Sequence, residues 1–128
     1  MTIYGVSVSA TDLPRAQAFY ELLGFRFPED DPAHAHLEAE DDSGVRLMVE
    51  SASSLTALYG GPPRPGTTAG FAMVVTSREA VDETIDRVRS AGHTVVTGPY
   101  DAPWGHRYAR VADPDGHQVV VFCPLAEE

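Results

Sequence analysis

The chain of 128 residues has one cysteine, little positive charge and no long apolar run. Cys123 therefore has no partner for an internal disulfide, and its apolar surroundings in the sequence are typical of a buried thiol. No stretch approaches the roughly 20 apolar residues that a membrane span needs. The first residues also lack the basic and apolar regions of a secretory signal. We therefore expect a cytoplasmic protein without a membrane partner.

The scarcity of positive charge leaves 9 basic residues against 19 acidic ones, a formal net charge of −10. Such a field repels nucleic acid and anionic lipid, and it mildly favours cationic ligands. The acidic residues are spread along the chain rather than gathered in a tail, so they also serve solubility. We expect no nucleic-acid partner.

The hydrophobic fraction of 43% and the length suit one domain with a real core. In the first half, alternation of apolar and polar residues predicts a strand at 4–10, followed by an N-cap at Thr11-Asp12. Helical spacing then runs to Gly24, where a left-handed residue ends the helix. Three further strands are predicted, with a hairpin turn between the last two: 25–27, 33–40 and 45–50.

The second half repeats this order. A strand at 70–75 leads to a cap at Thr76-Ser77, a helix closed by Gly92, and three more strands at 93–97, 107–112 and 118–123. Residues 52–68 are rich in Ser, Gly and Pro and are predicted to be a linker between module 1, about 1–51, and module 2, about 69–124. A ferredoxin-like domain with extra hairpins explains the elements but not the matched turns, so we favour an α+β fold of tandem βαβββ modules.

Several motifs resemble those of the vicinal oxygen chelate superfamily, which includes glyoxalases, bleomycin-resistance proteins and extradiol dioxygenases. They are Asp12-Leu13 with residues 18–25 (AFYELLGF), then 103–107 (PWGHR) and 113–117 (DPDGH). The resemblance implies that the modules form one domain, a curved mixed sheet whose concave cleft takes the ligand. Since many members of the superfamily are dimers, it also implies a homodimer.

The resemblance further implies metal ligands on the first and last strands of each module. The matching positions are Gly5, Leu47 or Met48, Gly70 and Val120, and none of these side chains has a donor for a divalent metal. We therefore expect no metal and no cofactor, so that isomerisation, ring cleavage and epoxide opening lose their Lewis acid. A displaced metal site remains an alternative, with the histidines and Glu50 as its donors.

Strand parity and the repeat select side chains for the predicted cleft. The set combines aromatic and polarizable groups with charges and hydroxyls, which is typical of a small-molecule pocket. Alternatively, Arg46 with Glu38, or Arg110 with Glu50, pairs across strands, and Trp104 plugs one end of the core. The predicted cleft residues are Ser7, Ser9, His36, Glu38, Arg46, Met48, Glu50, Trp104, Tyr108, Arg110 and Phe122.

Three functions fit this interpretation. The first is a metal-free binding protein that sequesters an aromatic or cationic small molecule, as bleomycin-binding relatives of the superfamily do. The second is a lyase-like or isomerase-like enzyme with Glu50 or Glu38 as base and Arg46 or Arg110 stabilising an anion. The third is a regulatory or partner domain without a working pocket. We favour the first.

Overall fold

The computed structural model describes residues 4–28, 36–41, 44–51 and 70–125. The chain divides into two compact units, Met1–Pro65 and Gly66–Glu128, and each is described by itself. The linker predicted at 52–68 lies outside the described residues. Among the helices in those ranges, none has the length and apolar character needed to cross a membrane.

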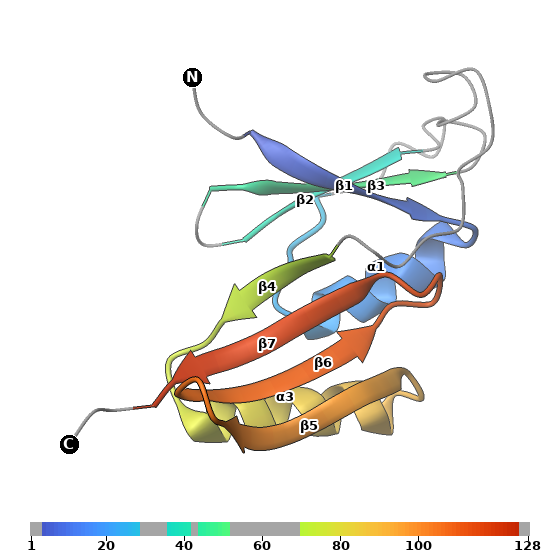
Figure 1. Ribbon diagram of the computed structural model, residues 1–128. Coiled ribbons are helices and arrows are strands. Elements are labelled where there is room, and N and C mark those ends of the chain that lie inside the picture. Colours follow the sequence, from blue (N-terminus) through green and yellow to red (C-terminus); the bar gives the residue numbers. More distant parts are fainter. Residues whose placement is uncertain (1–3, 29–35, 42–43, 52–69, 126–128) are drawn as a thin grey trace. The chain divides into compact units, whose positions relative to one another are not determined.

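The first unit contains β1 (Gly5–Ala10), α1 (Leu13–Leu22), β2 (His36–Glu40) and β3 (Arg46–Ser51), as Figure 1 shows. Its sheet has the order β1-β3-β2, with β1 parallel and β2 antiparallel to β3. The strand predicted at 25–27 is wrong in extent, since Arg26 forms only an isolated bridge with Glu40. Pro28 follows closely and has no N–H with which to continue a ladder.

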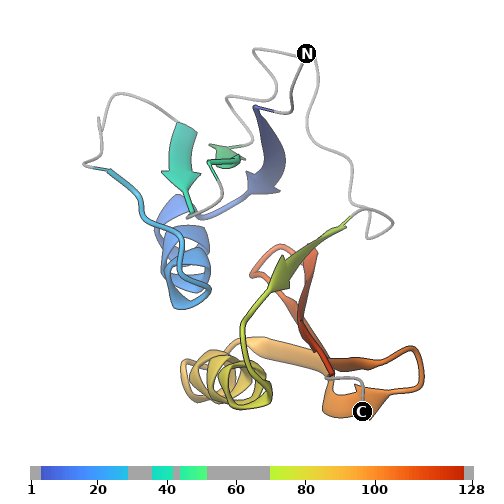
Figure 2. The ribbon, with the colours of Figure 1, turned by 90° about the vertical axis from the view of Figure 1, so that its left-hand side faces the viewer.

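Helix α1 begins and ends where the sequence predicts. The Asp12 carboxylate accepts a hydrogen bond from the Arg15 backbone N–H at 3.2 Å, and Gly24 adopts φ +94° just after the helix. One face of α1 packs against β2 and β3 (Figure 2). The buried side chains that α1, β2 and β3 contribute to this packing are Ala16, Phe19, Tyr20, Ala39, Leu47 and Val49.

The second unit contains β4 (Gly70–Val74), α3 (Arg78–Ser90), β5 (Thr94–Ala102), β6 (His106–Ala112) and β7 (Gln118–Pro124). Its sheet has the order β4-β7-β6-β5, with β4 parallel to β7 and the other pairs antiparallel. Strand β5 continues well beyond the predicted 93–97, through register shifts between Val95 and Tyr100. The α+β class is confirmed; the second unit has the full βαβββ order, while the first has only an isolated bridge in place of the strand after its helix.

Helix α3 covers one face of this sheet (Figure 2). Its N-cap Ser77 accepts a hydrogen bond from the Ala80 N–H at 3.0 Å. Cys123 lies in the same core and is buried, as predicted. The other buried apolar side chains between helix and sheet are Val81, Ile85, Val88, Ala109, Val111, Val119 and Val121.

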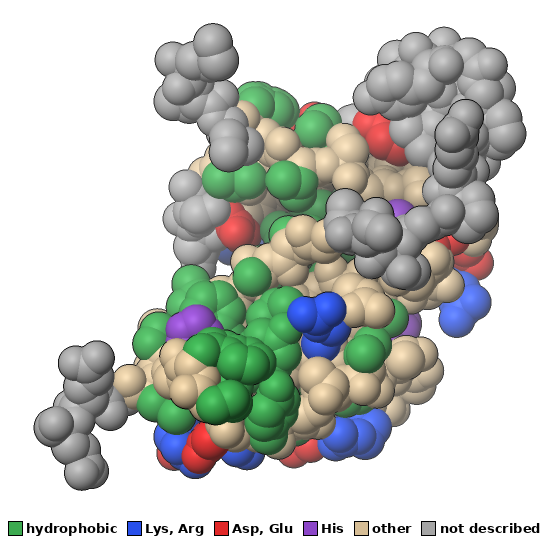
Figure 3. Space-filling view, in the orientation of Figure 1, with side chains coloured by type: hydrophobic (Ala, Val, Ile, Leu, Met, Phe, Trp, Pro, Cys, Tyr) green, Lys and Arg blue, Asp and Glu red, His purple; other side chains and the backbone are tan. Residues whose placement is uncertain are grey.

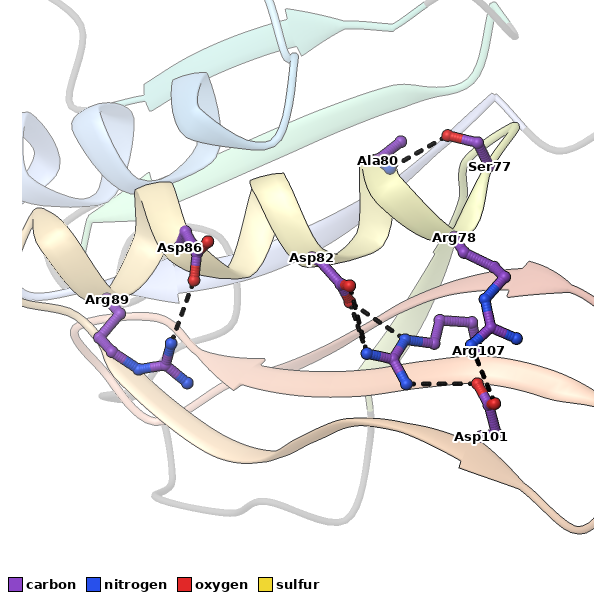
Figure 4. A network of polar contacts seen from close by, with 8 residues as sticks. All are labelled: Ser77, Arg78, Ala80, Asp82, Asp86, Arg89, Asp101 and Arg107. Atoms are coloured by element: carbon purple, nitrogen blue, oxygen red, sulfur yellow. Dashed lines mark hydrogen bonds and ion pairs between the residues drawn. The ribbon is translucent and has the colours of Figure 1, made fainter.

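An arginine on the helix-covered face ties α3 to the sheet (Figure 4). Arg107 of β6 donates to both carboxylate oxygens of Asp82 on α3, at 3.0 and 3.2 Å, and to Asp101 on β5 at 3.2 Å. Arg78 also donates to Asp101, at 3.0 Å. Desolvation opposes ionisation of Asp101, but the hydrogen bonds and charges of the two arginines outweigh it and lower its pKa. The two carboxylates of this network, Asp82 and Asp101, thus lie on the α3 side of the sheet.

Candidate functional site

The predicted cleft residues fall into two sets, one on the helix-free face of each unit. Paired residues on neighbouring strands point to the same side of a sheet. In the first unit the pairing therefore places one set opposite the face that α1 covers. That set is Ser7, Ser9, Glu38, Arg46, Met48 and Glu50, and the strand position of His36 is paired with that of Glu50. In the second unit Tyr108, Arg110 and Phe122 lie opposite the α3 face, and Trp104 lies in the turn between β5 and β6.

On the first unit, Ser9, Glu50 and His36 stand abreast across β1, β3 and β2. Glu50 is buried, with 5% of its surface exposed, although it lies on the face without the helix. The side chain of His36, like all of His34, lies outside the described residues. The first unit thus has a buried carboxylate, Glu50, paired across strands with Ser9.

The rest of this face is a paired charge cluster. Arg46 lies 3.4 Å from Glu38 and 3.7 Å from Glu40, so the predicted cross-strand pair of Arg46 and Glu38 is present. Tyr4, which the sequence analysis missed, donates its hydroxyl to Glu38, and Arg46 lies 5.9 Å from the centre of its ring. The hydrogen bond to Glu38, then desolvation, raises the pKa of Tyr4.

The second unit carries an aromatic cluster made of Tyr100, Trp104 and Tyr108. Ring centroids are 6.4 Å apart for Tyr100–Trp104, 5.9 Å for Tyr100–Tyr108 and 5.1 Å for Trp104–Tyr108, all nearly perpendicular. Trp104 is 55% exposed and Tyr100 is 38% exposed, so the alternative in which Trp104 plugs the core is wrong. In Figure 3 hydrophobic side chains gather over this sheet, with a histidine and an arginine beside them. Tyr100 was missed because the predicted strand ended at 97.

Arg110 and His106 complete this face. The Arg110 guanidinium donates to Gln118 Oε1 at 3.0 Å and to the Tyr108 hydroxyl at 2.6 Å, so these two partners lie on β7 and β6. The alternative pairing of Arg110 with Glu50 would join the two units and stays a prediction. The His106 ring stacks on Phe122 with centroids 4.5 Å apart. The spacing of His106, Tyr108 and Arg110 along β6 was a usable signal for His106, which the predicted set omitted.

The positions that the resemblance implies for a metal do not fit one. Pairing places Met48 opposite Ser7 on the face of Gly5, while the buried Leu47 lies on the face against which α1 packs, so Met48 is the matching position. A Cβ added at Gly5 would lie 2.5 Å from the Arg46 carbonyl oxygen. One added at Gly70 would lie 2.5 Å from that of Gln118.

Two of the four positions thus have no room for a side chain, and the other two, Met48 and Val120, carry apolar ones. Elsewhere in the described ranges, no group of three or more His, Cys, Asp or Glu residues is placed to hold a metal ion. We therefore assign no metal-dependent chemistry to these four positions.

Comparisons with known proteins agree on the fold family. The model of the Glyoxalase/Bleomycin resistance protein/Dioxygenase superfamily matches residues 3–121. A hypothetical protein from S. aureus is similar with a TM-score of 0.83 and 19% identity, covering 96% of this chain and 94% of that one. A superfamily enzyme from Burkholderia phytofirmans has a TM-score of 0.82 and 20% identity, covering 95% of this chain and 98% of that one.

One curated relative is an uncharacterised protein of Mycobacterium bovis, 42% identical over 62 residues. The match covers 48% of this chain and 39% of the relative, so the chain spans well under half of that protein's length.

Proposed function

The chain belongs to the glyoxalase/bleomycin resistance protein/dioxygenase superfamily, and from that premise we propose that it binds a planar small molecule on the helix-free face of its second unit. The observation that carries this proposal is the aromatic cluster of Tyr100, Trp104 and Tyr108, in which two large rings stay open to solvent. Flat aromatic surfaces beside a few fixed polar groups favour stacking of a planar ligand. Contiguous exposed apolar side chains, rather than scattered single ones, are typical of interaction and ligand-binding sites.

The proposed role is binding without chemical change, as in sequestration of a toxic aromatic compound. On the second unit's face, the polar groups beside the cluster are Arg110, Gln118 and His106, and the Arg110 contacts tie two of them together. This arrangement orients a ligand but pairs no base with a nucleophile.

A second candidate function is turnover, with Glu50 of the first unit as general base. Its support is the position of that carboxylate, which is buried on the helix-free face of the first unit's sheet. Mass spectrometry of a ligand recovered after incubation separates the two functions. An unaltered ligand supports binding, and a ligand of changed mass supports turnover.

The binding proposal is tested by thermal shift with planar aromatic compounds. We expect the melting temperature to rise with ligand concentration for at least one compound. Trp104→Ala should remove most of that rise, while Tyr4→Ala, which deletes an equally exposed ring from the first unit, should leave it intact.

Two results would contradict this placement. Equal loss in the two variants would mean that the second unit's face is not where the ligand stacks. A melting temperature that rises with protein concentration and not with ligand, and that loses this rise in Trp104→Ala, would instead identify the aromatic face as a subunit interface.

A further inference from the structure

The charged side chains on the helix-free face of the second unit indicate which charge a ligand should carry. This inference rests on the proposed function, that a planar small molecule binds there. Strands β4 to β7 contain a single carboxylate, Asp101. Asp101 pairs across strands with Arg107 and therefore lies on the α3 side, where it is neutralised by two arginines. The strands thus present no anion on the face that carries the aromatic cluster.

That face does present a cation. The sequence contains no lysine, so arginines supply its strong side-chain cations. Arg78, Arg89 and Arg107 each form an ion pair with an aspartate. Arg110, by contrast, has two neutral hydrogen-bond acceptors, Gln118 and Tyr108, and among the described residues of its own unit it pairs with no carboxylate.

The two neutral contacts fix the guanidinium without cancelling its charge. A guanidinium has five N–H donors in a planar fork, so three remain after the bonds to Gln118 and Tyr108. Carboxylates match that fork with paired, charge-assisted hydrogen bonds. Arg110 is thus prepared to receive an anionic oxygen pair.

Tyr108 joins this cation to the aromatic cluster. Its hydroxyl accepts from Arg110, its ring lies 5.9 Å from the guanidinium carbon, and its centroid is 5.1 Å from that of Trp104. One small molecule can therefore meet both features if it joins a flat ring directly to an acid group. We infer that the ligand of this face is a planar aromatic carboxylic acid, with its carboxylate on Arg110 and its ring against Trp104 and Tyr108.

The net charge of −10 suggests the opposite preference, for a cation. At physiological ionic strength, however, charges farther away than about 8 Å are largely screened, so a direct guanidinium contact outweighs the distant acidic surface. The ligand charge is consequently set by Arg110 and not by the overall balance.

The test compares three probes that share one ring system: 2-naphthoate, 2-naphthalenemethanol and 2-naphthylmethylammonium. Trp104 is the only tryptophan in the sequence, so its indole N–H resonance in the labelled full-length protein reports binding at this face. We expect all three to shift that resonance, with naphthoate binding at least about tenfold more tightly than the alcohol and the ammonium weakest.

Arg110→Gln should lower the naphthoate affinity to that of the alcohol and leave the alcohol unchanged. The matched control is Arg87→Gln, which removes an exposed arginine of α3 whose partner is also neutral, the Thr84 hydroxyl, and it should change neither affinity. Retention of the wild-type amide spectrum shows that each variant is folded.

The outcomes separate the two proposals. If the three probes bind equally, or if the ammonium binds best, the aromatic-acid inference is overturned while the binding site on this face stands. If Arg110→Gln leaves the naphthoate preference intact, Arg110 is not its source and the inference also fails. If no probe shifts the indole resonance, both proposals fall.

Discussion

The two units repeat one module, yet their helix-free faces differ in chemistry. The first face carries Glu38, Glu40 and Arg46 in a mutual charge cluster, with the buried Glu50 nearby. The second carries the aromatic cluster and an arginine with neutral partners. The helix-covered faces, in contrast, are alike in both units, each with buried Val and Ala side chains on its strands. Packing against a helix makes the centre of one face of each sheet apolar, with the Arg107 network on the α3 side of the second unit, whereas the helix-free faces differ in their side chains.

The difference in chemistry follows from a difference in strands. In the first unit the strand after the helix is reduced to the Arg26–Glu40 bridge, while in the second it is β5, which is nine residues long. The last part of β5 supplies Tyr100, and the turn that follows it supplies Trp104. The aromatic cluster therefore exists because the second module completes a strand that the first does not.

The largest expected effect concerns a feature that both units have. Within each unit, a glycine on the first strand lies close to the backbone of the parallel strand beside it. Gly5→Ala and Gly70→Ala each place a Cβ 2.5 Å from a backbone oxygen, so we expect each to lower the free energy of unfolding by about 1–3 kcal/mol. Ala72→Val, at an exposed position two residues along the same face of β4, should stay within about 0.5 kcal/mol. Urea unfolding measures all three. A large cost in only one glycine variant would mean that the units do not share this packing.

A smaller effect is expected from replacing an arginine in each unit, because the ion pairs of the two arginines differ. Arg107, with a side chain 20% exposed, holds carboxylates on two elements, so Arg107→Met should cost about 1–2 kcal/mol. Arg46 is 35% exposed and its contacts are longer, so Arg46→Met should cost about 0–1 kcal/mol. Methionine keeps much of the apolar stem in both cases. Urea midpoints in the reverse order would show that the first unit's charge cluster is the stronger one.

The sequence predicted the features that depend on local rules. The caps at Asp12 and Ser77 and the helix ends at Gly24 and Gly92 follow from side-chain hydrogen bonds and positive φ angles, which a few neighbouring residues determine. Strand parity likewise assigned Ser7, Glu38 and Arg110 to the faces that the pairing shows to be opposite the helices.

The features that depend on distant partners were not predictable in the same way. The length of β5 and the loss of the strand at 25–27 depend on which neighbour continues a ladder, and alternation within a segment carries no information about that. The partners of Arg110 and the exposure of Trp104 are tertiary facts as well. Candidate residues were therefore selected by type and face, while their contacts came from the structure.

The smallest effect concerns pH, and it tests whether the second unit's network on the α3 side depends on charge. The pKa of Asp101 is lowered in the folded protein, so its ionised form stabilises folding above the unfolded value of about 3.9. As pH falls through the folded pKa, Asp101 takes up a proton and that contribution is lost. Asp101→Asn should therefore melt below the wild type at pH 7, and the gap should close as the pH falls toward 3.

The matched control is Asp86→Asn, which removes an aspartate of α3 that is 74% exposed and forms an ion pair with Arg89 across one helical turn. Its melting temperature should stay near that of the wild type at pH 7, since exposed pairs of this kind contribute little. A gap for Asp101→Asn that stays constant down to pH 3 would mean that hydrogen-bond geometry, and not the carboxylate's charge, ties β5 to α3. In that case the charge of Asp101 would not explain why this carboxylate lies on the α3 side of the sheet and not on the face that carries Arg110.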